Sequence, residues 1–198
     1  MSLPNDALGR EEKETLLEVA RRSIRFGLRH NIPLDVDPPN YPETLSRIQS
    51  SFVTLKTPDD QLRGCIGSLE ARMELVRDVA MHAFAAASRD PRFPPLDEAE
   101  FERIRISISV LSPPKPLQAD SEQHLRQQLQ PGRDGLILRM GNKQATFLPA
   151  VWESLPNPEE FLAQLKRKAG LPPDFWSEHM EIHRYQSLSI TETPKDGE

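Results

Sequence analysis

The feature of this sequence that most constrains its fold is a strand–turn–strand pattern in residues 52–67. An apolar, β-rich run at residues 52–55 is followed by Pro58, Asp59 and Asp60, and then by residues 62–67, Leu-Arg-Gly-Cys-Ile-Gly. Proline followed by aspartates between two such runs is typical of a tight turn, so the pattern predicts a hairpin of two antiparallel strands. The hairpin favours a fold with antiparallel sheet over a doubly wound parallel one.

The remaining hydrophobic periodicity predicts a mixture of helices and strands. Apolar residues recur with helical spacing in residues 10–30 and 73–88. Residues 103–112 alternate isoleucine and valine with polar residues, as in a strand with one buried face. Shorter patterns predict helices at 121–129 and 157–168 and strands at 136–138, 145–148 and 178–190. The expected fold class is therefore α+β, with antiparallel sheets flanked by helices.

Composition and charge argue against several classes of protein. With 198 residues, the chain can bury the core of one large domain or two small ones. A formal net charge of −5 argues against broad binding to nucleic acid, and a single cysteine excludes an internal disulfide and a multi-cysteine metal site. The sequence shows neither a signal-peptide pattern nor an apolar stretch long enough to cross a bilayer. We therefore expect a cytoplasmic protein with no membrane association, metal or cofactor.

The second strand of the predicted hairpin carries the candidate nucleophile. Because side chains alternate across a strand, Arg63 and Cys65 share one face. Gly64 and Gly67 remove bulk beside the thiol, so that another backbone or a ligand can approach closely. A guanidinium on the same face favours the thiolate, which predicts a reactive or anion-binding surface. Alternatively, Cys65 is a small buried hydrophobic residue and the glycines mark a bulge.

A second candidate segment is Asp90-Pro91-Arg92-Phe93, which follows the helix predicted at residues 73–88. Pro91 ends that helix, and two further prolines make the segment a stiff loop. Binding residues concentrate on loops that a rigid scaffold positions, so Asp90, Arg92 and Phe93 are candidates for binding. The alternative is that Asp90 and Arg92 pair with each other and only hold the turn.

Two histidine patterns are weaker candidates. Asp78 and His82 are neighbours on the same predicted helix and could serve a cysteine as orienter and base, but an exposed local ion pair is the favoured interpretation. His179, Glu181 and His183 alternate onto one face of the predicted terminal strand. This spacing could hold a metal ion, but that face is more simply the solvent face.

Five segments, in order along the chain, resemble the conserved blocks of the AMMECR-type domain. They include the Leu-Arg-Gly-Cys-Ile-Gly stretch at 62–67 and Arg-Asp-Pro-Arg-Phe-Pro-Pro-Leu at 89–96. The others are the strand at 106–112 that ends in Ser-Val-Leu-Ser, Ala-Thr-Phe-Leu-Pro at 145–149 and Lys-Ala-Gly-Leu at 168–171. The resemblance spans roughly residues 14 to 192, almost the whole chain, and five ordered matches are a specific signal.

The resemblance implies an AMMECR-type domain at residues 10–192, between a disordered N-terminus at 1–9 and a disordered tail at 193–198. It also implies two unequal subdomains that meet at a cleft, with the cysteine motif near it. Bacterial members of the family resemble component A of the AmmeMemoRadiSam system. The implied partners are accordingly a Memo-type protein and a radical SAM enzyme.

These observations lead to two hypotheses about function. In the first, the protein is an enzyme or enzyme subunit that binds a small anionic or modified substrate, with Cys65 as the nucleophile and Arg63 and Arg92 holding the anionic group. In the second, it is a non-catalytic adaptor or binding domain in which the cysteine motif is structural. The resemblance places the other residues of the proposed binding site in the same two blocks: Gly64, Ile66, Gly67, Asp90 and Phe93. We expect Arg63, Cys65 and Arg92 to line one concave pocket with accessible polar ends.

Overall fold

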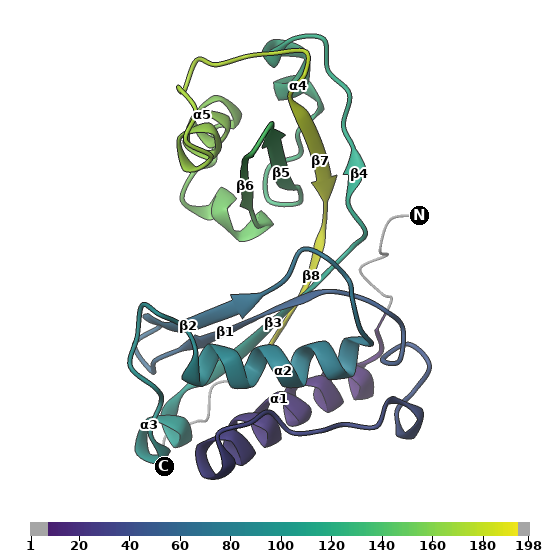
Figure 1. Ribbon diagram of the computed structural model, residues 1–198, viewed down its shortest axis with the longest axis vertical. Coiled ribbons are helices and arrows are strands. Elements are labelled where there is room, and N and C mark those ends of the chain that lie inside the picture. The colour runs from purple at the N-terminus through teal and green to yellow at the C-terminus, as the bar shows by residue number, and fades with distance from the viewer. Residues whose placement is uncertain (1–7, 194–198) are drawn as a thin grey trace. The chain divides into compact units, whose positions relative to one another are not determined.

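The computed structural model describes residues 8–193, and its α+β fold confirms the predicted class (Figure 1). The described residues form two compact units, a larger one of residues 8–111 and 188–193 and a smaller one of residues 112–187. Each unit contains a four-stranded antiparallel sheet. Two unequal units agree with the subdomains implied by the family resemblance, whereas the cleft stays a prediction.

The larger unit is a sheet with the strand order β2-β1-β3-β8 and helices packed on one face (Figure 1). Its strands are β1 (Ser51–Lys56), β2 (Leu62–Gly67), β3 (Arg105–Leu111) and β8 (Ser187–Thr191). Its helices are α1 (Arg10–His30), α2 (Leu75–Ser88), the short α3 (Glu98–Arg103) and the 3-10 turn η1 (Pro38–Asn40). The apolar sides of α1 and α2, which the periodicity predicted, lie on the sheet.

The predicted hairpin is present as β1 and β2. Its turn is closed by Thr57, whose N–H donates to the Gln61 carbonyl over 2.9 Å, and Asp60 adopts a left-handed conformation with φ of 62°. The register pairs Thr54 with Cys65 and Leu55 with Gly64. This register decides which side chains of the hairpin reach the helices and which reach the other face.

Alternation divides the side chains of this sheet between a core face and an open face. Val53, Leu55 and Ile106 are fully buried and belong to the core that α1 and α2 cover. Thr54, which lies between Val53 and Leu55, points to the opposite face together with its cross-strand partner Cys65. Because Cys65 lies opposite Thr54, its thiol lies on the face away from α2, and the residue is only partly buried there.

The predicted disordered termini, residues 1–9 and 193–198, overlap only partly with the residues that the structure describes. Residues 1–7 and 194–198 lie outside the described residues, so the expectations of disorder there stay predictions. Leu8 is described and is buried in the core of the larger unit, and Gly9 caps α1. The ordered segment therefore begins at least two residues before the predicted helix.

The smaller unit is a sheet with the order β4-β7-β5-β6 and its own hydrophobic core. Its strands are β4 (Lys115–Pro116), β5 (Gly135–Met140), β6 (Lys143–Phe147) and β7 (Glu181–Tyr185). Its helices are α4 (Glu122–Gln128), α5 (Pro158–Lys168) and the 3-10 turn η2 (Pro149–Glu153). The predicted start of α5 is confirmed, because the Asn157 side chain accepts a hydrogen bond from the Glu159 N–H.

The predicted terminal strand, residues 178–190, is wrong as a single element. It consists of β7 and β8, which belong to different sheets and are separated at Gln186. At this break, the Ser112 N–H donates to the Gln186 carbonyl over 2.8 Å, and the Gln186 N–H donates to Ser112 Oγ over 2.9 Å. The sequence of β8 alternates polar and apolar residues, whereas in β7 the buried residues Ile182 and Tyr185 are three apart; neither pattern reveals the change of sheet.

Candidate functional site

Cys65 lies on β2, an edge strand of the larger sheet (Figure 1). Its neighbour across the hairpin is Thr54, whose Oγ1 donates a hydrogen bond to the Cys65 Sγ over 3.3 Å. The backbone N–H and C=O of Cys65 point away from β1, as expected at a position of an antiparallel pair where side chains come closest. This backbone is therefore available to groups outside the sheet.

Asp90 and Arg92 bind that outward-facing backbone, and we call this ion pair the Asp90–Arg92 clasp. The Cys65 N–H donates to Asp90 Oδ2 over 2.8 Å, and Arg92 Nη2 donates to the Cys65 carbonyl over 3.3 Å. The clasp thus bonds the edge of β2 as a neighbouring strand would. Exposed edges invite pairing with other chains, so the clasp also protects this edge.

The two members of the clasp have very different exposure. Asp90 is 4% exposed and accepts bonds from Arg92 Nε over 2.9 Å, from Arg92 Nη2 over 2.7 Å and from the Arg92 N–H over 3.1 Å. These bonds, that of the arginine side chain first, hold the pKa of Asp90 well below its usual range, although burial opposes the shift. The Arg92 side chain is 53% exposed, and its guanidinium lies 5.5 Å from the centre of the Phe93 ring. One arginine can therefore hold Asp90 and still face solvent.

The expectation that the polar end of Arg63 is accessible is wrong. Arg63 is only 8% exposed, and its Nε and Nη2 each bond a different oxygen of Glu100 over 2.8 Å. Its Nη1 also donates to the Pro94 carbonyl over 3.0 Å. Arg63 thereby lowers the pKa of Glu100, chiefly through these hydrogen bonds. Its position on the strand was predictable, but its partner on α3 was not.

Replacing Arg63 by methionine is expected to lower the free energy of unfolding by about 2 kcal/mol, because the Pro94 carbonyl and Glu100, whose side chain is 34% exposed, lose the donors of a buried guanidinium. The matched control is Arg72→Met, which removes an arginine whose 74% exposed side chain pairs with Glu70. That change should cost less than about 0.5 kcal/mol. Urea unfolding of the three proteins measures both values, and equal losses would show that the Arg63–Glu100 pair contributes no more than a surface pair.

The space beside the glycines of the motif is occupied by other residues of the protein. A Cβ on Gly64 would lie 2.2 Å from the Ala86 carbonyl oxygen, and one on Gly67 would lie 2.3 Å from the Phe52 ring. Ile66 packs against the core of the larger unit. The close approach that the glycines predicted is therefore real, but the approaching groups are Ala86 on α2 and Phe52 on β1. A binding role for these three residues stays a prediction.

The Asp78–His82 pair was expected to be exposed, and this is wrong. Both side chains are buried, and Asp78 Oδ2 accepts hydrogen bonds from His82 Nδ1 over 3.0 Å, from the Ser51 N–H over 2.8 Å and from Ser51 Oγ over 2.6 Å. The pair joins α2 to the first residue of β1. Because α2 covers the core face and the Cys65 thiol lies on the open face, His82 is not placed to act as its base.

The three residues considered for a metal site do not share one strand face. His179 precedes β7 and lies in a turn that the Met180 N–H closes on the Ser177 carbonyl over 3.0 Å. Glu181 and His183 belong to β7. Within residues 8–193, no group of three or more histidine, cysteine, aspartate or glutamate side chains is arranged to hold a metal ion.

The structure therefore brings Cys65, Asp90, Arg92 and Phe93 together. The Arg63 guanidinium lies 5.8 Å from the centre of the same Phe93 ring, but its hydrogen bonds go to Glu100 and Pro94. Two contacts were missed at the sequence level. Thr54 could have been found by counting the hairpin register from the turn, which places it opposite Cys65. Glu100 offered no comparable signal, because its contact with Arg63 depends on how α3 folds back against β2.

The fold and this edge-strand site define an α+β protein with a clasped cysteine. The sequence model of the AMMECR1 family matches residues 17–190, so the chain belongs to that family. A similar protein is MK0488 of Methanopyrus kandleri, 39% identical over 195 residues that cover 94% of this chain and 91% of the relative. MJ0810 of Methanocaldococcus jannaschii is 38% identical over 166 residues, with 80% and 81% coverage.

A solved structure supports the same relationship. The crystal structure of the uncharacterized protein PH0010 from Pyrococcus horikoshii is similar to this chain with a TM-score of 0.86 and 33% sequence identity. The match covers 97% of each chain. None of the helices within residues 8–193 combines the length and the hydrophobicity that crossing a bilayer requires.

Proposed function

We propose that this protein is an enzyme or enzyme subunit that binds a small anionic or modified substrate beside Cys65. Cys65 acts as nucleophile or covalent anchor, and Arg92 attracts the anionic group. The observation that supports this proposal is a partly buried cysteine whose backbone N–H and C=O are both held by a clasp with a half-exposed arginine. Arg63 is left out of the ligand set, because an anion would have to displace Glu100.

The geometry of Arg92 supports this role. Its Nε and Nη2 are engaged by Asp90, whereas its Nη1 has no hydrogen-bond partner among residues 8–193. The guanidinium carries a permanent positive charge, and such groups suit carboxylates and phosphates. A ligand anion would therefore meet a cation that Asp90 already holds in place, so little ordering of the side chain is needed on binding.

A second function, a non-catalytic adaptor or binding domain, is favoured by a different observation. The hydroxyl of Thr54 donates a hydrogen bond to the thiol. The space that side chains at Gly64 and Gly67 would occupy is taken by Ala86 and Phe52. All three contacts are those expected if the motif only packs and closes the edge of a sheet. Cys65 would then be structural, and the recognition surface would lie elsewhere.

The proposal includes the partners implied by the family resemblance. In this view the protein works in the cytoplasm with a Memo-type protein and a radical SAM enzyme. Its part would be to hold a small substrate or intermediate at Cys65. This partnership rests on the resemblance, and the chemistry at Cys65 can be tested without it.

Alkylation of the native protein separates the two functions. Iodoacetate and iodoacetamide attack the same thiol, but only iodoacetate is an anion. If Arg92 attracts anions, Arg92→Gln should lower the rate of iodoacetate relative to that of iodoacetamide by about fivefold at low salt. This is the effect of about 1 kcal/mol, the interaction of two charges 4 Å apart in water. Any change in accessibility of the thiol affects both reagents and cancels in this ratio.

The control is Arg72→Gln, which removes an exposed arginine outside the clasp and should leave the ratio unchanged. Melting temperatures of both variants show whether the fold is retained. A Cys65 that reacts only after unfolding would contradict the catalytic proposal and favour the adaptor function. A native thiol whose rate ratio is unaffected by Arg92→Gln would contradict the role given to Arg92.

A further inference from the structure

Within residues 8–193 the chain passes between the two units twice, at residues 111–112 and again at residues 187–188. The two crossings are hydrogen-bonded to each other. The Ser112 N–H donates to the Gln186 carbonyl over 2.8 Å, and the Gln186 N–H donates to Ser112 Oγ over 2.9 Å. The units are therefore joined by one ribbon of two antiparallel segments, and not by two separate linkers.

On the side of the larger unit, the ribbon is formed by β3 and β8, which are neighbours in the sheet. The Glu192 N–H donates to the Ile106 carbonyl over 3.0 Å, and the hydroxyls of Ser107 and Thr191 are hydrogen-bonded over 2.9 Å. Each step along β3 is thus matched by one step back along β8. The same register continues to the bonded pair at the crossing.

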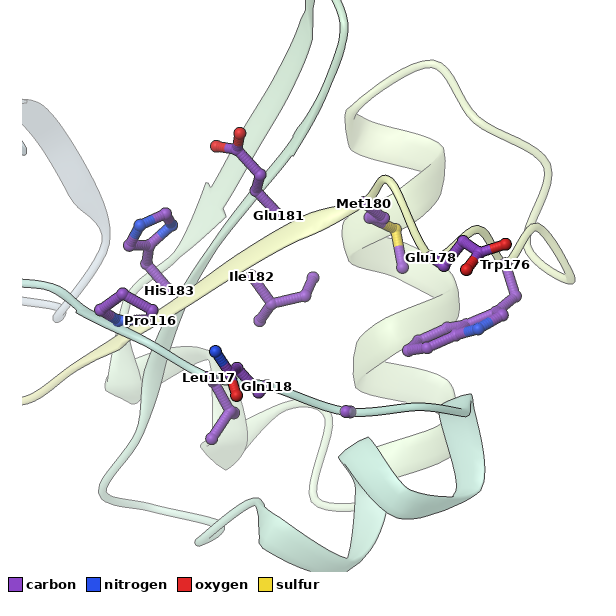
Figure 2. Close-up of a pocket in the computed structure, with 10 residues that line it drawn as sticks. Pro116, Leu117, Gln118, Trp176, Glu178, Met180, Glu181, Ile182 and His183 are labelled. Carbon is purple, nitrogen blue, oxygen red and sulfur yellow. The ribbon is translucent and has the colours of Figure 1, made fainter.

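On the side of the smaller unit, the ribbon continues as β4 and β7. Pro116 is the cross-strand partner of His183, and the two lie next to each other in Figure 2. The Leu117 N–H then donates to the Ile182 carbonyl over 2.8 Å. Beyond this bond the two segments separate and line a cavity, so the ribbon ends here (Figure 2).

The registers on the two sides of the crossing differ by one residue. After the pair of Ser112 and Gln186, the next pair is Lys115 and Arg184, which is three steps along one segment and two along the other. The segment after β3 therefore contains one extra residue, as in a β-bulge. A bulge interrupts the ladder of hydrogen bonds and bends the strand that carries it.

Pro113 and Pro114 occupy this bulge, and both are exposed. Proline has no N–H, so neither residue can donate a hydrogen bond to the opposite segment. The last bond before the bulge is also irregular, because the Gln186 N–H donates to the side chain of Ser112 and not to its carbonyl. The ribbon is therefore weakest at the crossing itself.

The neighbouring strands of the two sheets support the ribbon on either side of this point. β1 pairs with β3 as far as Val110, and β5 pairs with β7 as far as Tyr185. Between these limits the backbone depends on the two segments of the ribbon. A two-stranded element has marginal stability by itself, whereas the sheets on both sides have four strands.

We infer that this ribbon is a hinge, about which the smaller unit rotates relative to the larger one by bending and twisting at Ser112, Gln186 and the two prolines. Hinges are formed by a few residues at the ends of elements that absorb changes of φ and ψ. Two bonded crossings at one place resist sliding, so the motion is a rotation. The hinge involves none of the residues assigned to the function at Cys65, and its test does not depend on that function.

Distances between pairs of nitroxide labels, measured by double electron–electron resonance on the full chain, test the inference. In a Cys65→Ala background, Glu11→Cys and Gln127→Cys place one label on an exposed helix position of each unit. Two control pairs lie within one unit: Glu11→Cys with Ala99→Cys, and Gln127→Cys with Arg167→Cys. The distance distribution between the units is expected to be about twice as wide as those within them.

Changes in the ribbon should alter this width in opposite directions. Ser112→Ala removes the acceptor of the Gln186 N–H and should widen the distribution by about half, whereas Ser109→Ala, within β3, should leave it unchanged. Deletion of Pro114 removes the extra residue, so that one register runs through the crossing, and should narrow it. Melting temperatures show whether each variant is folded. A distribution between the units as narrow as the controls, or a width that neither ribbon change alters, would overturn the inference.

Discussion

Replacing Gly64 by alanine is expected to lower the free energy of unfolding by about 3 kcal/mol or more, and the loss should be larger still for valine. A Cβ at this position would lie 2.2 Å from the carbonyl oxygen of Ala86 and 3.2 Å from its carbonyl carbon. Both atoms belong to the backbone of α2, so no change of rotamer relieves the overlap. The sheet and α2 would have to move apart, and the packing of Val53 and Leu55 would loosen with them.

Chemical denaturation of Gly64→Ala measures this loss, and Gly9→Ala is the matched control. Gly9 precedes α1 with φ of −66°, and a Cβ there would meet only a side-chain oxygen of Glu12, at 3.4 Å. The control should lose less than about 1 kcal/mol, the difference between glycine and alanine as capping residues. If Gly64→Ala were as stable as the control, the space at Gly64 would be free for a ligand, as the sequence first suggested.

The period-two patterns predicted the sheet of the larger unit because burial there is one-sided. In β3, Ile106 and Ile108 reach the core under α1 and α2, and the alternate residues Arg105, Ser107 and Ser109 are polar. The same rule failed at β7 and β8. A strand pattern records which face is buried, and it does not record which sheet provides the core.

The sequence predicted that Cys65 and Arg92 lie close together, but it did not predict which groups each arginine of the site would contact. Cys65 and Arg92 were expected near each other, and a hydrogen bond from Arg92 Nη2 to the Cys65 carbonyl joins them. The role of Arg63 was not predictable in the same way. Whether an arginine on a strand faces solvent or a carboxylate depends on Glu100, which the chain brings to β2 only through the folded position of α3. Of the alternatives for Asp90, the pairing with Arg92 is present, and Asp90 also accepts a hydrogen bond from the Cys65 N–H; a role in binding a ligand stays a prediction.

Removing the carboxylate of the clasp, by Asp90→Ala, is expected to cost about 3 kcal/mol of unfolding free energy at neutral pH. The Cys65 N–H loses its acceptor, and Arg92 loses the group that binds two of its nitrogens. Arg92 is half exposed and regains water, so the loss should be near the lower end of that expected for a buried ion pair. The control is Glu14→Ala, at an exposed carboxylate of α1 paired with Arg10, which should change stability little.

The pH dependence of this loss distinguishes a charged clasp from a packing defect. The pKa of Asp90 is lowered in the folded protein, chiefly by the hydrogen bonds of Arg92, while in the unfolded chain it returns to about 3.9. The stability that the carboxylate provides is therefore complete above about pH 5 and declines as the pH falls below the unfolded pKa, because only the unfolded chain then takes up the proton. The difference in unfolding free energy between the wild type and Asp90→Ala should narrow by about 1 kcal/mol from pH 5 to pH 3. Contributions of other carboxylates cancel in this difference. A difference that stays constant to pH 3 would mean that Asp90 acts by shape and not by charge, and Arg92 would then be free of the ion pair on which its proposed role depends.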